Sequence, residues 1–169
     1  MRFILRAILG CVLFIGVALD NARAQAIVDF HARSGPDLVG HAFIVYGRLD
    51  GRGGIASAHV AGFYTNEQHY FKGLLFPLPG FVGSEKEDIA FKSAVVYRRI
   101  LTEGELRELR LGIARVKAMQ HSWHLLFFNC NDFVGEIAEL IGLHRPPSVQ
   151  LPVSYVAALG AMNGLTRLR

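Results

Sequence analysis

The segment 125–140, LLFFNCNDFVGEIAEL, changes character abruptly in its middle. Its first half is an apolar run typical of an extended segment, and its second half repeats apolar residues at helical spacing. Asn129, between the two halves, is a preferred helix N-cap, and Gly142 is a typical helix-terminating residue. The pattern therefore predicts a helix from Cys130 to about Ile141, with Cys130 at the corner between the extended segment and the helix.

A cysteine at the first position of a helix lies beside unpaired backbone N–H groups and the positive end of the helix dipole. Both stabilise a thiolate over a thiol, and the same N–H groups can hold the oxyanion that forms when a carbonyl is attacked. The position predicts that Cys130 is a nucleophile with a lowered pKa, with Asn129 and Asn131 as cap and oxyanion residues. The alternative is a buried Cys130 that acts only as a small hydrophobic side chain.

The rest of the chain alternates predicted strands with separate helices. The predicted strands are 27–34, 37–49, 55–65 and 92–101, with a hairpin turn at 50–54. A Thr102–Glu105 capping box predicts a helix over 103–119. The remaining segments are a long loop over 66–92, an extended segment over 121–128, and a proline-marked extended segment with a short helix over 144–160. This order predicts an α+β fold in which an antiparallel sheet packs against helices.

The first 26 residues, MRFILRAILGCVLFIGVALDNARAQA, have the order of a secretory signal peptide. Two arginines precede an apolar run, and A-x-A cleavage patterns follow at 22–24 and 24–26. We predict a signal peptide over 1–26, a single domain over 27–169, and export to the periplasm or the cell exterior. The alternatives are an uncleaved membrane anchor and lipidation at Cys11; peripheral contact with a membrane is a further expectation.

The charge distribution and the number of cysteines argue against nucleic-acid binding and against an internal disulfide. The formal net charge of +4 owes much to arginines of the first 26 residues, and no basic run with interleaved aromatics indicates nucleic-acid binding. The chain has two cysteines, so loss of Cys11 with the signal peptide leaves Cys130 unable to form an internal disulfide. A free thiol in an oxidising compartment is a liability unless it is buried or used. No cofactor is predicted.

A cysteine nucleophile needs a general base, which is usually a histidine oriented by a third polar group. His41 lies on the predicted strand 37–49, and His59 lies on the return strand after the 50–54 turn. Antiparallel pairing through this turn predicts that the two histidines lie nearly opposite each other. We predict His41 as the base and His59 as the residue that orients it; the alternative for each is a hydrogen-bonded core histidine.

Two further predictions concern the surroundings of this pair. His121, His124 and Cys130, with His144 or Asp132 as a fourth ligand, offer an alternative zinc site, although their spacing matches no closed ligand set. Tyr64 and Trp123 are predicted to line a substrate groove, together with aromatic residues of the loop 66–83. The alternative is that these aromatic side chains pack on the core.

Taken together, GHAFIVYGRLDG and the later NCNDFVGEIAELIGL resemble the circularly permuted branch of the papain-like fold shared with NlpC-type cell-wall peptidases. This branch includes the lecithin:retinol acyltransferase, PPPDE isopeptidase and YiiX-like families, in which a strand histidine precedes an Asn-Cys motif at a helix start. The resemblance implies Cys130 as nucleophile, His41 as base and His59 as the second histidine. The chain departs from the acyltransferases at Asn131-Asp132, where they prefer Glu-His, and its spacing from His41 to His59 is longer.

These observations predict an exported thiol hydrolase, an amidase or peptidase that acts on peptidoglycan peptides of the cell envelope through a Cys130 acyl-enzyme. One alternative is a lipid-directed acyltransferase or thioesterase that uses the same residues on lipid acyl groups. Another is a non-catalytic envelope-binding module.

Overall fold

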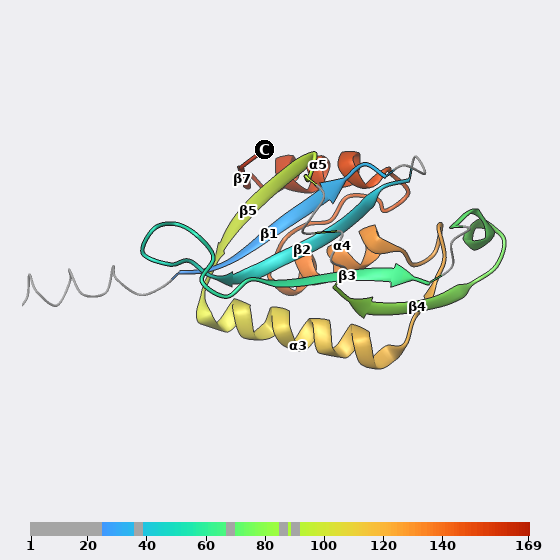
Figure 1. The fold of residues 1–169 in the computed structure, drawn as a ribbon, viewed down its shortest axis with the longest axis horizontal. Helices are drawn as coiled ribbons and strands as arrows, with labels where there is room; N and C mark the ends of the chain where they lie inside the picture. The colour runs from blue at the N-terminus through green and yellow to red at the C-terminus, as the bar shows by residue number, and fades with distance from the viewer. Residues whose placement is uncertain (1–24, 36–38, 67–69, 85–87, 89–91) are drawn as a thin grey trace, which may run out of the picture.

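The computed structural model describes residues 25–35, 39–66, 70–84, 88 and 92–169. Nearly all of the predicted signal peptide, residues 1–24, lies outside the described residues. The described part is an α+β fold in which a seven-stranded antiparallel sheet packs against helices, as the sequence predicts (Figure 1). The sheet begins at Ala26, so the last residue of the predicted signal segment already belongs to a strand.

The strands are arranged in the order β6-β4-β3-β2-β1-β5-β7. Their bounds are β1 Ala26–Arg33, β2 His41–Arg48, β3 His59–Thr65, β4 Leu78–Gly83, β5 Val95–Leu101, β6 Ser122–Trp123 and β7 Thr166–Arg167. β1 is central and pairs along its length with β2 and β5. The pairing of β2 with β3 ends at Phe43 opposite Gly62, although both strands continue beyond this pair. The first two residues of β2 therefore have no partner on β3, because the two strands separate there.

Three α-helices in the described residues, α3 Glu103–Met119, α4 Cys130–Leu140 and α5 Pro152–Met162, share one hydrophobic core with the sheet. The sheet contributes alternate residues to this core, such as Phe30 on β1 and Ile44 on β2. In Figure 1 α4 and α5 lie behind the sheet and α3 runs along its lower edge. α4 is the most buried helix, because it contacts β2, β3, α3 and α5. Its position fixes Cys130 against the sheet.

The opposite face of the sheet is polar in its middle. The side chains that alternate with the core residues include Asp29 and His31 on β1, His41 on β2 and Tyr64 on β3. Asp29, His41 and Tyr64 are buried although they lie outside the helix-covered core. Part of their cover comes from Asp88, between β4 and β5, which contacts this face.

The local predictions are confirmed where the sequence carries its own capping or turn signal. α3 has the predicted bounds and the Thr102–Glu105 capping box. α4 begins at Cys130 as predicted, and Gly142 follows it with a φ of 76°. At the 50–54 turn, a carboxylate oxygen of Asp50 accepts the N–H groups of Arg52 and Gly54.

Three predictions of local structure are wrong. The return strand starts at His59 and not at Ile55, because residues 56–58 turn and pack against Gly47, where a Cβ atom would lie 2.4 Å from the Ser57 carbonyl oxygen. The predicted loop 66–92 contains the 3-10 helix η1 Tyr70–Leu74 and the strand β4, which pairs with β3.

The third concerns the segment 121–128, which is predicted as extended. The segment 121–128 contributes only the two residues of β6, because it then turns and closes on itself through a His124–Phe128 bridge. The helix predicted within the segment 144–160 is present: α5 starts at Pro152, at a position where proline is favoured, and continues to Met162.

Within the described residues, no helix is both long enough and apolar enough to cross a membrane.

The fit of α5 on the sheet predicts a clear difference between two glycine substitutions. A Cβ atom on Gly160 would lie 2.3 Å from the Tyr97 ring, whereas one on Gly104 in α3 would meet nothing closer than 3.8 Å. We expect Gly160→Ala to lower the free energy of unfolding by about 1–3 kcal/mol through overpacking. Gly104→Ala is the matched control and should leave it unchanged or raise it by up to ~1 kcal/mol. Urea unfolding of both variants tests this, and equal effects would contradict the close packing of α5 on β5.

Candidate active site

The start of α4 is held by a buried polar cap. The side-chain oxygen of Asn129 accepts the N–H of Asn131 at 2.8 Å, and the Asp132 carboxylate accepts the N–H of Asn129 at 3.0 Å. This reciprocal arrangement is a capping box, so Asn129 is the N-cap as predicted. All four residues from Asn129 to Asp132 are buried, and the helix start is therefore fixed in the interior of the protein.

Cys130 lies where α4 meets the first residues of β2. Its side chain belongs to the core together with Ala42, and the backbone N–H groups of Ala42, Asn131 and Cys130 itself lie near enough to its sulfur to lower the pKa of the thiol. These donors favour the thiolate, but burial disfavours it more strongly and raises the pKa of the Cys130 thiol to about 11. The predicted lowering of this pKa is wrong for the structure, because removal of the sulfur from water outweighs the helix N-terminus.

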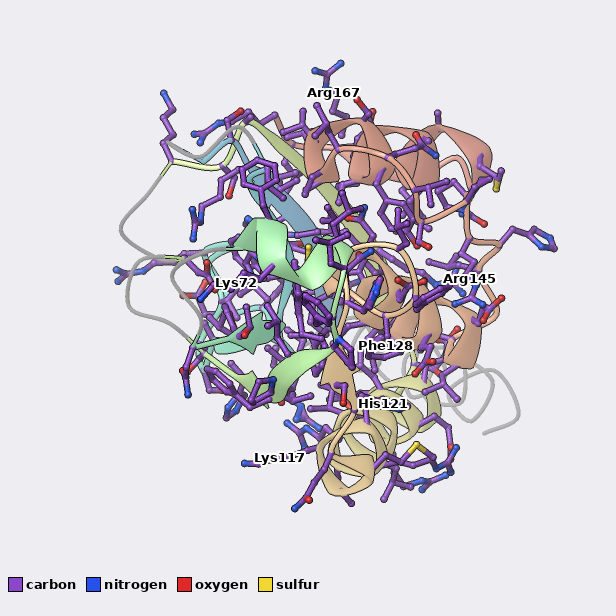
Figure 2. The ribbon with its side chains drawn as sticks, turned by 90° about the vertical axis from the view of Figure 1, so that its right-hand side faces the viewer. Lys72, Lys117, His121, Phe128, Arg145 and Arg167 are labelled. Carbon is purple, nitrogen blue, oxygen red and sulfur yellow. The ribbon has the colours of Figure 1, made fainter. Side chains whose placement is uncertain are left out.

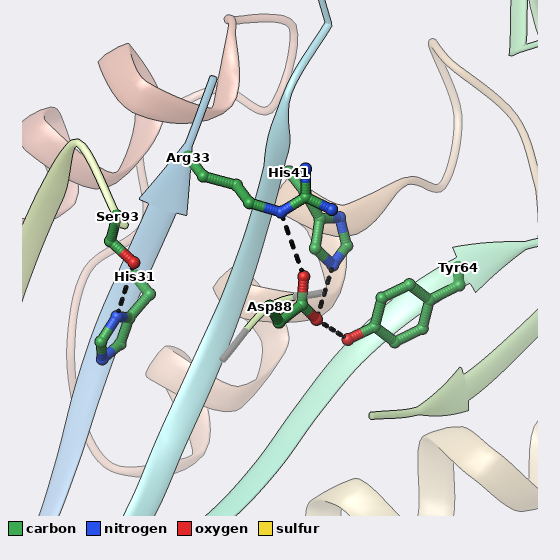
Figure 3. A network of polar contacts seen from close by, with 6 residues as sticks. All are labelled: His31, Arg33, His41, Tyr64, Asp88 and Ser93. Carbon is green, nitrogen blue, oxygen red and sulfur yellow. Dashed lines mark hydrogen bonds and ion pairs between the residues drawn. The ribbon is translucent and has the colours of Figure 1, made fainter. Parts of the chain in front are cut away.

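His41, the first residue of β2, belongs to a polar network on the other face of the sheet (Figure 3). Its Nε2 lies 3.9 Å from Oδ2 of Asp88. The same carboxylate accepts a hydrogen bond from the Tyr64 hydroxyl and one of 3.2 Å from Nε of Arg33. The His41 ring also contacts the Tyr64 ring, with 4.6 Å between centroids. Asp88 therefore joins three side chains from β1, β2 and β3.

Gly62 provides the space for this network. A Cβ atom at Gly62 would lie 2.6 Å from the Tyr64 hydroxyl and 2.8 Å from Nε2 of His41. Both distances are far below normal contact, so any larger residue would displace one of the two side chains. The glycine lies opposite Phe43, at the last pair before β2 and β3 separate.

Cys130 and His41 approach the same end of β2 from opposite sides. The sulfur faces the N–H of Ala42, whereas the side chain of His41, one residue earlier, points to the opposite face of the sheet. Among the contacts between described residues, none joins the sulfur to the imidazole. Burial lowers the pKa of His41 to about 4, and the neighbouring Asp88 carboxylate opposes this only in part. The resting pair is therefore a neutral thiol and a neutral imidazole.

The predicted role of His59 as the partner of His41 is wrong. The observed register places His59 opposite Tyr46, at the far end of β2 from His41. His59 is exposed there and stacks on the Tyr46 ring. The prediction assumed that β3 follows the 50–54 turn directly, whereas the turn at 56–58 delays the strand. The polar group next to His41 is Asp88.

The amides of Asn129 and Asn131 are bound to the backbone and do not face an acyl group. The Asn129 side-chain N–H₂ donates to the Leu125 carbonyl at 2.8 Å. That of Asn131 donates to the carbonyls of Ser148 and Gln150 at 2.9 and 2.8 Å, which ties the segment before α5 to the start of α4. The amide donors of both side chains are therefore used within the fold. The backbone N–H of Cys130 is at a helix position that has no intrahelical acceptor.

The remaining predicted site residues are packing or bonded residues. Trp123 is buried against Gly73, where a Cβ atom would lie 2.3 Å from its ring, so it does not line an open groove. Tyr64 is buried, and its hydroxyl donates a hydrogen bond to the Asp88 carboxylate. His121 stacks on Phe128, with 4.2 Å between centroids (Figure 2).

The alternative zinc site is not assembled. Nδ1 of His124 accepts the N–H of Leu126 within the same turn. No group of three histidine, cysteine or acidic residues in the described part of the chain is placed to hold a metal ion.

Sequence reasoning missed Asp88, Arg33 and Gly62. Asp88 lies in a segment whose sequence carries no periodic pattern, so nothing local indicates that it reaches the sheet. Gly62 carried a weak signal, because an isolated glycine in a strand often marks a close approach to the backbone.

Comparison with known proteins adds no relative: no family model, no curated protein and no solved structure matches this chain.

Cys130 should react as a buried thiol and not as a preformed thiolate. With a pKa of about 11, its alkylation by iodoacetamide should rise with pH without a plateau near neutrality. At about pH 7 it should be at least two orders of magnitude slower than for an unfolded-chain cysteine of pKa ~8.5. Alkylation in urea is the control. A plateau below pH 7 that disappears in His41→Gln would contradict the neutral resting pair.

The buried neutral His41 also predicts a pH dependence of stability. The unfolded chain takes up a proton at this residue near pH 6.5, but the folded protein does so only near pH 4. Because the unfolded state binds more protons in this window, the free energy of unfolding should fall as the pH drops from 6.5 to about 4. His41→Gln should make this fall less steep, whereas the exposed His59→Gln should not. Identical slopes in urea unfolding of all three proteins would contradict the burial of a neutral His41.

Proposed function

We propose that this protein is a thiol hydrolase, an amidase or peptidase, in which Cys130 is the nucleophile, His41 the general base and Asp88 the residue that orients His41. The observation that carries the proposal is the meeting of the α4 N-terminus with the start of β2. There the Cys130 sulfur faces the N–H of Ala42, and the adjacent His41 has its Nε2 directed at a buried carboxylate. A cysteine at a helix start, preceded in the chain by a strand histidine, is the arrangement that the resemblance to the permuted papain-like fold implies; Asp88 stands beside His41 where that resemblance implied a second histidine.

The chemistry follows from these groups. As the sulfur bonds to the acyl carbon, His41 accepts the thiol proton, and the carbonyl oxygen becomes an oxyanion near the helix N-terminus. His41 then donates the proton to the leaving amine, which leaves a thioester on Cys130. Water attacks the thioester with His41 as base and regenerates the thiol. Catalytic contacts are often long in a resting enzyme and shorten when substrate binds.

The neutral resting pair gives this mechanism a particular form. A thiol with a pKa of about 11 does not give its proton to an imidazole with a pKa of about 4 in the absence of substrate. Proton transfer must therefore accompany attack on the carbonyl. The His41 ring must also turn toward the sulfur past the start of β2, where His41 and Ala42 pair with β1 and no β3 residue pairs with them.

Asp88 supports this role for His41. Its carboxylate is held by Arg33 and Tyr64, so it keeps a fixed position when the imidazole becomes charged. An imidazolium next to Asp88 is stabilised by the opposite charge, which compensates part of the cost of burial. We assign to Asp88 the orienting role that was predicted for His59 from the sequence.

The segment 1–26, with its signal-peptide order, supports a substrate outside the cytoplasm. Peptidoglycan stem peptides of the cell envelope are the acyl compounds of this kind that fit an amidase or peptidase. Lipid acyl groups of the envelope are the alternative substrate.

An exposed apolar surface favours the lipid alternative as a second candidate. It consists of Phe71, Leu74, Leu75, Phe76, Leu126 and Phe127. The two parts of this surface are joined because the Leu125 N–H donates to the Gly73 carbonyl at 2.9 Å. The turn that carries Phe127 leads directly into Asn129 and Cys130, so the surface borders the candidate nucleophile. An acyl chain or a membrane surface is the partner that such a surface suits.

The nucleophile can be tested by trapping an acyl-enzyme. The full-length protein, incubated with activated short-chain esters, should form a hydroxylamine-sensitive thioester detectable by mass spectrometry, and Cys130→Ser should not. His41→Gln should slow acylation by about 10²–10⁴-fold, as expected for loss of a general base. Asp88→Asn should slow it less and change its pH profile, and His59→Gln should be the matched control without effect.

A comparison of two substrate classes distinguishes the peptidase from the lipid enzyme. Faster turnover of muropeptides than of phospholipid vesicles supports the peptidase. Faster turnover of the vesicles, together with a loss of this turnover in Phe127→Ser, supports the lipid enzyme. If Cys130→Ser turns over any substrate as fast as the wild type does, the thiol mechanism is wrong. If neither protein turns over any of them, the protein is better described as a binding module.

A further inference from the structure

The polar face of the sheet contains a cavity of about 390 Å³ on the side away from α4. It is lined by residues of four adjacent strands, β3, β2, β1 and β5, and by residues next to β5 and β7. Cys130 and His41 are not among its lining residues. It therefore borders the candidate active site only through Asp88, which lines it, and its volume is in the range of small-molecule sites.

The lining is divided into an apolar half and a polar half. Toward β2 and β3 it consists of Val45, Val60 and Ala58. Toward β1, β5 and β7 it includes the polar His31 and Ser93 together with the apolar Val96 and Leu168. Phe43 lies between the two halves, and its ring stacks on His31 with 5.0 Å between centroids. A ligand that fills this cavity must therefore have an apolar part and a polar end.

The charges around the polar half favour an anionic end. Two carboxylates line the cavity, but each already has its own arginine. Asp29 accepts both Nε and Nη2 of Arg98, at 2.7 and 2.8 Å, and Asp88 accepts Nε of Arg33. Because neither arginine lines the cavity, both carboxylates are neutralised from outside it.

Lys92 and Arg169 are the two positively charged residues among the described residues that line the cavity, and they determine the electrostatic potential of its polar half. The Arg169 guanidinium donates to the Ser93 carbonyl at 3.1 Å, which holds it beside His31. Lys92, the residue before Ser93, forms no ion pair with the other described residues. The polar half therefore carries net positive charge.

His31 supplies a directed hydrogen-bonding group at this end. Its Nδ1 lies 3.0 Å from the Ser93 hydroxyl oxygen (Figure 3), and its buried Nε2 meets no hydrogen-bond partner among the described residues. A buried polar nitrogen without a partner is unfavourable, because it has lost its hydrogen bonds to water. When the Ser93 hydroxyl donates to Nδ1, Nε2 carries the hydrogen and offers it to an acceptor. Burial lowers the pKa of His31 to about 4, so it is a neutral donor near pH 7.

We propose that this cavity binds an amphipathic carboxylate, with the carboxylate between Lys92, Arg169 and Nε2 of His31 and the aliphatic chain along Val45 and Val60. The three polar groups supply two positive charges and one hydrogen-bond donor, which match a single carboxylate. The apolar half buries the chain on the strands β2 and β3. The proposal does not depend on the thiol mechanism, because the site uses none of its groups except the shared neighbour Asp88.

Octanoate is a suitable probe, with octanol and octylamine as ligands that keep the chain but change the charge. In calorimetric titration of the full-length protein near pH 7, octanoate should bind at one saturable site. Octanol and octylamine should bind at least about tenfold more weakly. Equal binding of octanoate and octanol would overturn the proposal in favour of a purely apolar cavity, and preference for octylamine would show that the carboxylates dominate.

Matched variants locate the site. Lys92→Gln should weaken octanoate binding by about tenfold, whereas Lys117→Gln on the exposed face of α3, the same change in charge, should not. His31→Phe should weaken octanoate more than octanol, because it removes the donor and keeps a ring. Equal affinity of Lys92→Gln and Lys117→Gln, or no saturable binding, would overturn the proposal. Cys130→Ser should bind octanoate as the wild type does, so failure of the thiol mechanism would leave this result unchanged.

Discussion

The burial of the α4 start against the sheet is the constraint on which the rest of the structure depends. A helix N-terminus in the interior must satisfy its own N–H groups, and here Asn129 and Asp132 do so reciprocally. The Asn131 amide then binds the carbonyls of Ser148 and Gln150 and so fixes the approach to α5. The apolar side of α4, with Phe133 and Ile137 fully buried, completes the core shared by the sheet and the other helices. Loss of this cap would leave several polar groups buried without partners, which is among the most costly changes in a protein interior.

The same burial determines the chemistry of Cys130. A helix N-terminus and three backbone N–H groups favour a thiolate, yet the surrounding core favours the neutral thiol by a larger margin. His41 follows the same rule on the other face of the sheet, where burial outweighs the nearby Asp88 carboxylate. The two groups therefore rest in their uncharged forms, and a reaction at this site must create its charges only when an acyl substrate is present. This distinguishes the proposed site from one that keeps a permanent thiolate–imidazolium pair.

The two faces of the sheet differ in composition: one is apolar and the other is polar in its middle. One face carries the alternate residues of β1, β2 and β3 that form the core with the helices. The other carries buried polar residues that are paired across strands, with Asp29 bound to Arg98 and Asp88 bound to Arg33 and Tyr64. The first residue of β2, His41, belongs to the polar face, while its neighbour Ala42 contacts the cysteine on the core face. At this end of β2, within the described structure, Cys130 and the polar network contact neighbouring residues of one strand.

Features encoded by neighbouring residues could be predicted from the sequence. The helices starting at Glu103 and Cys130, the Asn129 cap and the turn at Asp50 all depend on contacts within a few residues, so their bounds follow from the local pattern. The α+β class follows from the order of these elements. Only the tertiary structure decided that His59 on β3 lies opposite Tyr46, far from His41. It also decided that Asp88 is the partner of His41 and that the thiol of Cys130 is less acidic than usual. Register, the path of the segment around Asp88 and burial all depend on residues far apart in the chain, and it is burial that sets the free energy of the charged forms.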